Sequence, residues 1–149
     1  MFAPKKILVP TDFSKHSDKA LKEAVDIAKK YGSKIYLLHV IDEHIQQCAV
    51  DYCIGEEIVR KLQRDSLKAS KEKLNRDINT MVDTKKLDIE IDVKEGVPAE
   101  LILSEQKKKG IDLIVIASHG KTGILKNLIG GVTDKVVRGA KCPVIVVKP

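Results

Sequence analysis

The sequence predicts an α/β fold in which an open, five-stranded parallel sheet is covered by helices on both faces. Two observations predict this fold, and a third predicts a single domain. Short apolar runs typical of buried strands alternate with longer segments of helical periodicity. Glycine or proline stands at most of the boundaries between them. The 149 residues contain no repeat, linker or low-complexity tract. We therefore expect residues 1–149 to form one domain of ordinary size.

The first third of the chain supplies two strands and a helix. Residues 7–10, Ile-Leu-Val-Pro, are predicted to form a buried strand that ends at its proline. Ser14 or Ser17 can cap the following helix, and Gly32 ends it. Residues 35–41 are the second apolar strand. The helix is expected to bury one face, formed by Ala20, Leu21, Ala24, Val25, Ala28 and Tyr31.

The middle of the chain is predicted to contain two helices and an edge strand. Residues 42–55 are polar and irregular, and a long helix then runs from residue 56 to about residue 82. Residues 87–93 alternate apolar and acidic side chains, a pattern typical of an edge strand with one solvated face. Pro98 suits the first turn of the next helix and Gly110 its end. The apolar stripe of the long helix is expected to be Val59, Leu62, Leu74, Ile78 and Met81.

The last part of the chain, IDLIVIASHGKTGILKNLIGGVTDKVVRGAKCPVIVV, is suited to bind phosphate. Strand 113–117 leads into the turn Ser118-His119-Gly120, and Gly130-Gly131 opens a helix that precedes strand 144–147. A glycine lets backbone amides approach a ligand closely. The first amides of a helix are unpaired and carry the positive end of its dipole. An anion is therefore expected at the start of this helix.

Parallel sheets bind ligands at the carboxyl ends of their strands, where strand order reverses. If the strand order is 3-2-1-4-5, the loop Pro10-Thr11-Asp12 faces the loop 117–131 across a crevice. Asp12 is suited either to bond ribose hydroxyls or to act as a turn or helix-cap residue. Beside the glycine loop we favour the ligand role. Lys121 is equally suited to contact phosphate or to remain solvated.

The sequence does not predict a catalytic centre. Gly120-Lys121-Thr122 resembles the end of a P-loop, but the first glycine of that pattern would fall at Val115, inside a strand. The dinucleotide fingerprint fails because the first strand leads into Pro10-Thr11-Asp12 rather than into glycines. His119 has no neighbouring acid or nucleophile in sequence, and Ser118 lacks the nucleophile-elbow pattern. We therefore do not expect an enzyme.

Composition limits the partners. The net charge is +6, but the lysines are dispersed and alternate with acids, and aromatic platforms for bases are missing. We expect no nucleic-acid binding. The start of the sequence has no signal-peptide pattern and no run is long enough to span a bilayer, so a cytoplasmic protein is expected. Cys48 and Cys53, with His44, match no zinc spacing, so we predict no metal site, and Cys142 is expected to be a small buried residue.

These motifs, in this order, resemble the universal stress protein family over essentially the whole chain. The matching segments are Ile7 to Ser14 (ILVPTDFS), Leu37 to Val40 (LLHV), Gly96 to Ala99 (GVPA), Asp112 to Gly120, and Cys142 to Lys148. The resemblance implies a Rossmann-like sheet of order 3-2-1-4-5, similar to that of the adenine nucleotide alpha hydrolases.

The ATP-binding branch of that family is marked by G-x-x-G, nine residues, then G-(S/T). Gly120 and Gly130 match it, whereas Ala117 and Gly131 depart from it. We expect weaker rather than abolished binding of ATP or AMP, with Mg²⁺, because Gly131 keeps its amide. The resemblance implies that Asp12 and Val40 hold adenine and ribose. It implies phosphate contacts from Ala117, His119, Gly120, Gly130, Gly131, Val132 and Thr133, and walls formed by Pro10, Thr11 and Ile116.

The expected function is that of a nucleotide-binding regulatory module in the stress response, with little or no catalysis. The alternative is a family member without nucleotide function that binds a protein partner as a dimeric scaffold. Electron transfer by a bound flavin is disfavoured, because aromatic residues that would stack on the flavin are nearly absent. The resemblance and the apolar last strand both predict a homodimer, paired through Val144, Ile145, Val146 and Val147.

Overall fold

The computed structural model describes residues 1–42, 55–81, 84–121 and 128–149. Its elements are β1 (Lys6–Thr11), α1 (Lys15–Tyr31), β2 (Lys34–Asp42), α3 (Glu56–Thr80), β3 (Ile89–Gly96), α4 (Pro98–Lys109), β4 (Leu113–Ala117), α5 (Gly131–Gly139) and β5 (Val144–Val147). The five strands form one sheet of order β3-β2-β1-β4-β5, and every neighbouring pair is parallel. The predicted fold class and strand order are confirmed.

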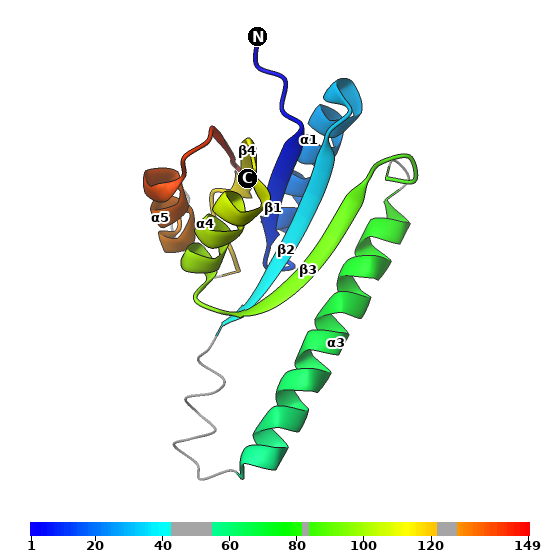
Figure 1. The fold of residues 1–149 in the computed structure, drawn as a ribbon, viewed down its shortest axis with the longest axis vertical. Coiled ribbons are helices and arrows are strands. Elements are labelled where there is room, and N and C mark those ends of the chain that lie inside the picture. The colour runs from blue at the N-terminus through cyan, green and yellow to red at the C-terminus, as the bar shows by residue number, and fades with distance from the viewer. Residues whose placement is uncertain (43–54, 82–83, 122–127) are drawn as a thin grey trace.

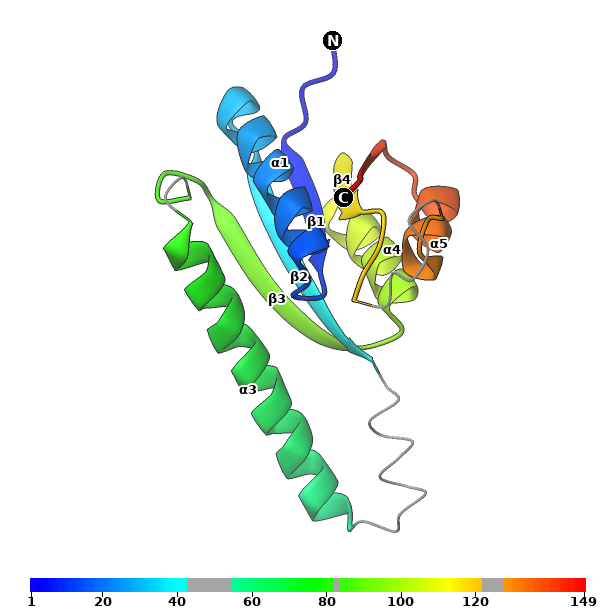
Figure 2. The same ribbon diagram turned by 180° about the vertical axis from the view of Figure 1, so that it is seen from behind.

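Helices cover both faces of the sheet, as Figures 1 and 2 show from opposite sides. Successive strand residues point to opposite faces. In β1, Ile7 and Val9 belong to the core cluster beneath α1 and α3, whereas Leu8 belongs to the cluster beneath α4 and α5. The sheet is therefore buried on both sides at its centre, which explains why β1 and β4 read as continuous apolar runs.

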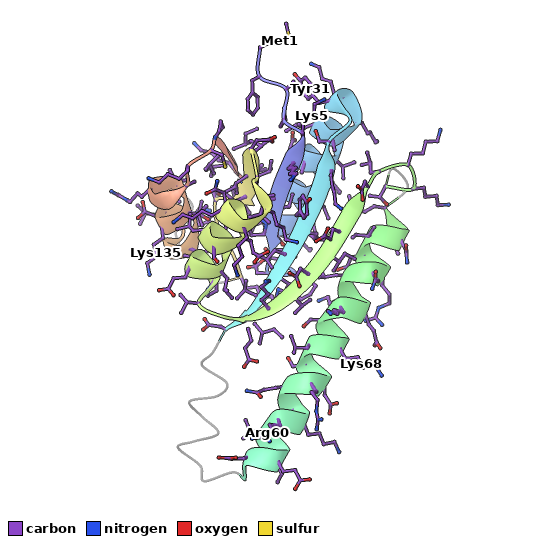
Figure 3. The ribbon with its side chains drawn as sticks, viewed as in Figure 1. Met1, Lys5, Tyr31, Arg60, Lys68 and Lys135 are labelled. Carbon is purple, nitrogen blue, oxygen red and sulfur yellow. The ribbon has the colours of Figure 1, made fainter. Side chains whose placement is uncertain are left out.

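Helix α1 is delimited by its capping residues. The Ser14 hydroxyl accepts a hydrogen bond from the Ser17 amide at 3.2 Å, so Ser14 is the N-cap. Gly32 ends the helix in the left-handed conformation, with φ of 65°. The predicted apolar face is buried except for Tyr31, which is half-exposed at the last turn. That turn lies at the opposite end of the sheet from the cavity described below, beside Lys5 (Figure 3).

Strand β1 continues to Thr11, so the prediction that Pro10 ends it is wrong. The Lys6 carbonyl accepts from the Asp112 amide at the start of β4, so even-numbered residues of β1 direct their backbone groups toward β4. Pairing between β1 and β4 stops at Leu8. The missing N–H of Pro10 therefore faces a position where no ladder bond is required, and the proline is tolerated.

Helix α3 begins at Glu56 as predicted, but its expected apolar stripe is partly wrong. Leu74 is buried against the sheet, whereas Leu62 is 51% exposed. The first turns of the helix, which carry Arg60, extend beyond the end of the sheet (Figures 1 and 3). Helical periodicity shows which side chains share a face but not whether a sheet lies beneath them. Across the described ranges, no helix combines the length and apolarity needed to cross a membrane.

Strand β3 lies at the sheet edge as predicted, but it begins at Ile89 rather than Leu87. The Leu87 amide donates to the Thr84 carbonyl at 3.0 Å and is thereby held in a turn. The acidic residues of the strand also have partners: Glu90 pairs with Lys34 at 3.0 Å and contacts Lys109. The solvated face of this edge is therefore covered by ion pairs rather than left bare.

Candidate functional site

A cavity of about 260 Å³ lies at the carboxyl ends of β1, β2 and β4. This is where the strand order reverses between β1 and β4. Its lining includes every residue singled out from the sequence: Pro10, Thr11, Asp12, Val40, Ile116, Ala117, His119, Gly120, Gly130, Gly131, Val132 and Thr133. The sequence did not point to the remaining lining residues Ser17, Leu38, Pro98 and Ile102, and left Lys121 open.

Part of the cavity lining is apolar. Leu38 and Val40 reach it from β2, Pro98 and Ile102 from α4, and Ile116 from β4. Their positions in sequence carry no ligand signal, because they follow the same periodicity as other core residues. Only the packing of α4 over β2 brings them to a common wall. This wall suits the flat face of an aromatic ring.

The start of α5 also lines the cavity. Gly130 is the N-cap, and within the described residues no side chain caps the helix. The positive end of the helix dipole and the first helical amides therefore face the cavity at Gly131 and Val132. A β-carbon added at Gly131 would meet no atom within 4 Å. A side chain at this position would therefore enter open space, and the residues at the helix start line the cavity where an anion site is expected.

Two hydrogen bonds hold the start of α5 against the end of β4 and the residue that follows it. The buried Thr133 hydroxyl donates to the Ala117 carbonyl at 2.8 Å, and the Gly130 amide donates to the Ser118 carbonyl at 2.7 Å. The Thr133 side chain thus has a structural partner, although the resemblance implied a phosphate contact at this residue. These bonds fix the helix start relative to the sheet.

Asp12 bridges the two loops that form the rim. One carboxylate oxygen, Oδ1, accepts from the Ser14 amide at 3.0 Å, and the other, Oδ2, accepts from the Lys121 amide at 2.8 Å. Burial alone raises the pKa of Asp12, but the hydrogen bonds from Ser14 and Lys121 outweigh burial and lower it. The carboxylate is therefore ionised at neutral pH. Of the two roles that the sequence left open for Asp12, the turn role is formed in this structure.

The whole architecture matches one known family. Residues 4–148 match the family model of the universal stress proteins. The chain belongs to the universal stress protein family. Universal stress protein MJ0531 of Methanocaldococcus jannaschii is 36% identical over 97% of this chain and 82% of its own length. A second relative from that organism, MJ0577, is 33% identical over 97% of this chain and 94% of its own length.

Solved structures of universal stress proteins share the fold. The structure of MJ0577 superposes with a TM-score of 0.85 at 32% identity, covering 99% of this chain and 98% of that one. A universal stress protein in complex with cAMP has a TM-score of 0.63 at 22% identity, covering 99% and 98%. One from Archaeoglobus fulgidus in complex with dAMP has a TM-score of 0.61 at 17% identity, covering 99% and 100%. The two nucleotide complexes are remote enough to show the fold alone.

In this universal stress protein the turn after β1 is strained and closely packed. Phe13 adopts a positive φ of 63°, which costs a non-glycine residue about 1–2 kcal/mol. Its ring lies against the His39 ring, with centroids 4.3 Å apart, and the Lys73 ammonium lies 4.3 Å from the ring centroid. Its amide donates to the Thr11 hydroxyl at 3.1 Å. These contacts offset the backbone strain and hold Asp12 in place.

Two histidines flank the cavity. His39 lies behind the rim, with Nδ1 2.8 Å from the Thr11 carbonyl oxygen. Burial lowers the pKa of His39, and nearby Lys121 and Lys73 lower it further against the opposing effect of Thr11 and Asp12. His119 lines the cavity and is itself buried, with Nδ1 2.8 Å from the Ser118 hydroxyl. That contact sets the orientation of the His119 ring.

Two further predictions from the sequence concern a metal site and the cysteines. Cys48, Cys53 and His44 lie outside the described residues. Across 1–42, 55–81, 84–121 and 128–149, no group of three or more histidine, cysteine or acidic side chains is arranged to hold a metal ion. Cys142 is half-buried rather than buried, and burial together with Asp112 raises the pKa of its thiol. At neutral pH this thiol is therefore protonated and weakly reactive.

Proposed function

We propose that this universal stress protein binds an adenine nucleotide, ATP or AMP, in the cavity between the β1 and β4 loops. It acts in the cytoplasm as a regulatory module of the stress response rather than as an efficient enzyme. The observation that carries the proposal is the meeting of an apolar wall and an uncapped helix start in one cavity. Base and ribose lie along the wall, and the phosphates, with their Mg²⁺, lie at the start of α5.

The two departures from the ATP-binding motif leave this site intact. Ala117 belongs to the core cluster beneath α1 and α3, whereas the wall residues Leu38, Ile102 and Ile116 belong to the cluster on the opposite face. The extra methyl group at Ala117 therefore packs in the core and does not fill the cavity. Gly131 lacks a hydroxyl but keeps its amide at the helix start, and the residue lines the cavity. Both substitutions are compatible with a bound phosphate.

Relatives support the choice of adenine. Universal stress proteins of the same fold have been solved in complex with cAMP and with dAMP. Both ligands combine an adenine base with a single phosphate. A cavity of about 260 Å³ is close to the lower end of the range for small-molecule sites, about 300–1,000 Å³, and is suited to a ligand of this size.

The first test is the mass of any nucleotide released from the purified protein by denaturation. Calorimetry with ATP and AMP, with and without Mg²⁺, then measures affinity, and GTP tests the preference for adenine. In Val132→Glu, a carboxylate replaces a partly exposed side chain beside the first helical amides. It favours the helix dipole but repels phosphate, so binding weakens while the fold persists. The matched control is Val137→Glu, on the same helix and away from the cavity.

Absence of released nucleotide, together with no shift in melting temperature at millimolar ATP or AMP, contradicts the proposal and favours the partner-binding scaffold. Nucleotide hydrolysis should be slow or undetectable. Turnover at a typical enzymatic rate, about 1–10³ s⁻¹, is inconsistent with a binding module.

We further propose that the protein is a homodimer paired through β5. This strand is an edge of the sheet, and its Ile145 side chain is 38% exposed. An apolar edge strand is a template for pairing with another chain. Antiparallel pairing of Val144 to Val147 with the same strand of a second copy satisfies the outer backbone groups and covers the side chains.

A further inference from the structure

We infer that the end of the sheet opposite the cavity docks on the surface of an anionic lipid bilayer, with Phe2 at the contact. This surface is separate from the proposed nucleotide site and does not depend on it. It lies where the five strands begin, and we call it the basic end. The segments that form it lead into the strands: 1–6, 29–34, 84–88, 107–112 and 138–143.

The parallel topology gathers lysines that are dispersed in the sequence. Because all neighbouring strands are parallel, every strand begins at the same edge of the sheet. The five segments hold twelve of the 27 basic residues of the chain but two of its 21 acidic residues. The rest of the chain is therefore net acidic, and the overall charge of +6 comes from this end. Figure 3 shows Lys5 and Tyr31 at the basic end and Arg60 far from it.

The two acids of the basic end do not neutralise its exposed lysines. Asp112 accepts hydrogen bonds from the Lys5 amide at 3.0 Å and the Lys6 amide at 3.1 Å, so its charge is directed at the backbone. Asp88 lies 3.7 Å from Lys34. Among the described residues, no acid forms an ion pair with the following exposed lysines: Lys5, Lys30, Lys85, Lys86, Lys107, Lys108 and Lys141.

Helix dipoles explain only part of this charge. Basic residues in the last turn of a helix are stabilised by the negative end of its dipole, and this accounts for the lysines that end α1 and α4. It does not account for the lysines in the turns between elements, which are Lys5, Lys85, Lys86 and Lys141. Gathering like charges costs stability through repulsion. An anionic partner would remove that cost.

The composition of the basic end favours a lipid surface. Eleven of its twelve basic residues are lysines, which meet phosphate as point charges rather than through the bidentate geometry of arginine. Phe2, just before Lys5 and Lys6, is 51% exposed. Lysines attract anionic headgroups, and an exposed aromatic ring among them is suited to enter the boundary between headgroups and acyl chains.

The segment that carries Phe2 is fixed to the basic end. The Pro4 carbonyl accepts a hydrogen bond from the buried Ser33 hydroxyl at 2.7 Å, and Asp112 holds the next two amides. Beyond Pro4 the chain projects away from the sheet (Figure 1). Phe2 is therefore two residues from a fixed point, and a bilayer that contacts the lysines lies within its reach.

The first experiment measures sedimentation with vesicles at physiological ionic strength. Vesicles of phosphatidylcholine alone are compared with vesicles that also contain phosphatidylglycerol. We expect binding to the mixed vesicles only, weakening as salt is added. Each lysine near an anionic leaflet contributes about fivefold to binding. A variant that carries four substitutions at the basic end should therefore bind at least tenfold more weakly: Lys85→Gln, Lys86→Gln, Lys107→Gln and Lys108→Gln.

The matched control removes the same charge from exposed positions elsewhere. Its substitutions, on α3 and α5, are Lys61→Gln, Lys68→Gln, Lys71→Gln and Lys135→Gln. This control should bind vesicles as wild type does. An equal loss in the two variants would show that net charge rather than the basic end decides, and overturns the inference. Failure of wild type to sediment with the mixed vesicles also overturns it.

The second experiment identifies the contact. The sequence contains no tryptophan, so Phe2→Trp introduces a single reporter. We expect its fluorescence to shift to the blue with mixed vesicles but not with duplex DNA. Leu62→Trp, at a position on α3 that is 51% exposed, should not shift. A missing shift at position 2 in protein that sediments overturns the contact, and tighter binding of duplex DNA than of vesicles overturns the choice of a bilayer.

Nucleotide binding provides the last comparison. Because the cavity lies at the opposite ends of the strands, the variant with four substitutions at the basic end should bind ATP and AMP as wild type does. A parallel loss of nucleotide and vesicle binding would show a general defect of the fold and overturns the assignment to this end. If wild type binds no nucleotide, the proposed function fails, and the vesicle measurements still decide whether the basic end docks on lipid.

Discussion

The amide of Gly130 lies 2.7 Å from the carbonyl oxygen of Ser118 and donates its hydrogen to it. This bond joins the start of α5 to the turn after β4. It also occupies the Gly130 amide, so the donors left for an anion are the following amides, at Gly131 and Val132. The two glycines of the motif therefore have different roles. Gly130 allows close approach of two backbone segments, and Gly131 faces the ligand space.

Replacement of Gly130 should disturb the site more than replacement of its neighbour. A β-carbon at Gly130 would lie 3.3 Å from the Ser118 carbonyl oxygen and 3.8 Å from the His119 Cα, so Gly130→Val forces the backbone apart. We expect a loss of about 1–3 kcal/mol in unfolding free energy and weaker nucleotide binding. Gly131→Ala, with open space at its β-carbon, should fold as wild type. Wild-type affinity of Gly130→Val in calorimetry would contradict the placement of the phosphates.

Gly131→Ser restores the hydroxyl of the family motif. Because the added side chain enters open space, it should reach a bound phosphate without displacing protein atoms. One added hydrogen bond is worth about 0.5–1.5 kcal/mol, or up to roughly tenfold in affinity. Gly131→Ala is the matched control, since it adds the β-carbon without the hydroxyl. Equal affinities for the serine and alanine variants would show that no phosphate lies within reach.

His39 should make stability depend on pH near neutrality. Its pKa is lowered below the ordinary 6.5 in the folded protein, so the unfolded chain binds a proton more readily. The resulting stability is fully present above pH 6.5 and is lost as the pH falls through the folded pKa. Denaturation midpoints from pH 7.5 to 5 should therefore fall less steeply in His39→Gln than in wild type. Identical slopes would rule out His39 as the source.

The β5 edge can be tested with one charge. Ile145→Lys places a lysine on the most exposed residue of the strand, a common way to prevent edge pairing. We expect wild type to sediment as a dimer at micromolar concentration and the variant as a folded monomer. Val137→Lys, which changes an exposed residue of α5 in the same way, should remain dimeric. A wild-type monomer by light scattering would refute the proposed pairing.

The predictable parts of the fold are those that depend on local chemistry. Ser14 and Gly32 delimit α1 through capping rules that act within one turn, and Pro98 and Gly110 do the same for α4. The parallel sheet followed from the alternation of strands and helices, and its strand order from the family resemblance. The errors have two different causes. Leu62 is exposed because the sheet, which is built from distant parts of the chain, ends before it. Leu87 is held in a local turn by the hydrogen bond from its amide to the Thr84 carbonyl, and the alternating pattern of its side chains does not reveal this bond.

The candidate site shows the same division. Glycines, Asp12 and the strand-end residues carry a signal in sequence, and they all line the cavity. Leu38 and Ile102 do not, because their pattern is that of any core residue and only the packing of α4 on β2 turns them toward a ligand. The link between Asp12 and the Lys121 amide was also out of reach. Every residue except proline carries the same backbone amide, so the sequence does not show which amide will bond Asp12.

The hydrogen bond from the Lys121 amide to Asp12 joins residues 109 positions apart. A nascent chain leaving the ribosome therefore presents Asp12 long before the segment that completes the rim exists. A domain generally folds as a unit, and β4, which lies between β1 and β5 in the sheet, is also synthesised late. Nucleotide cannot bind before β4 and the start of α5 exist, because both line the cavity. It can bind only to chains whose synthesis has passed α5. Nucleotide binding therefore indicates that the cavity is complete.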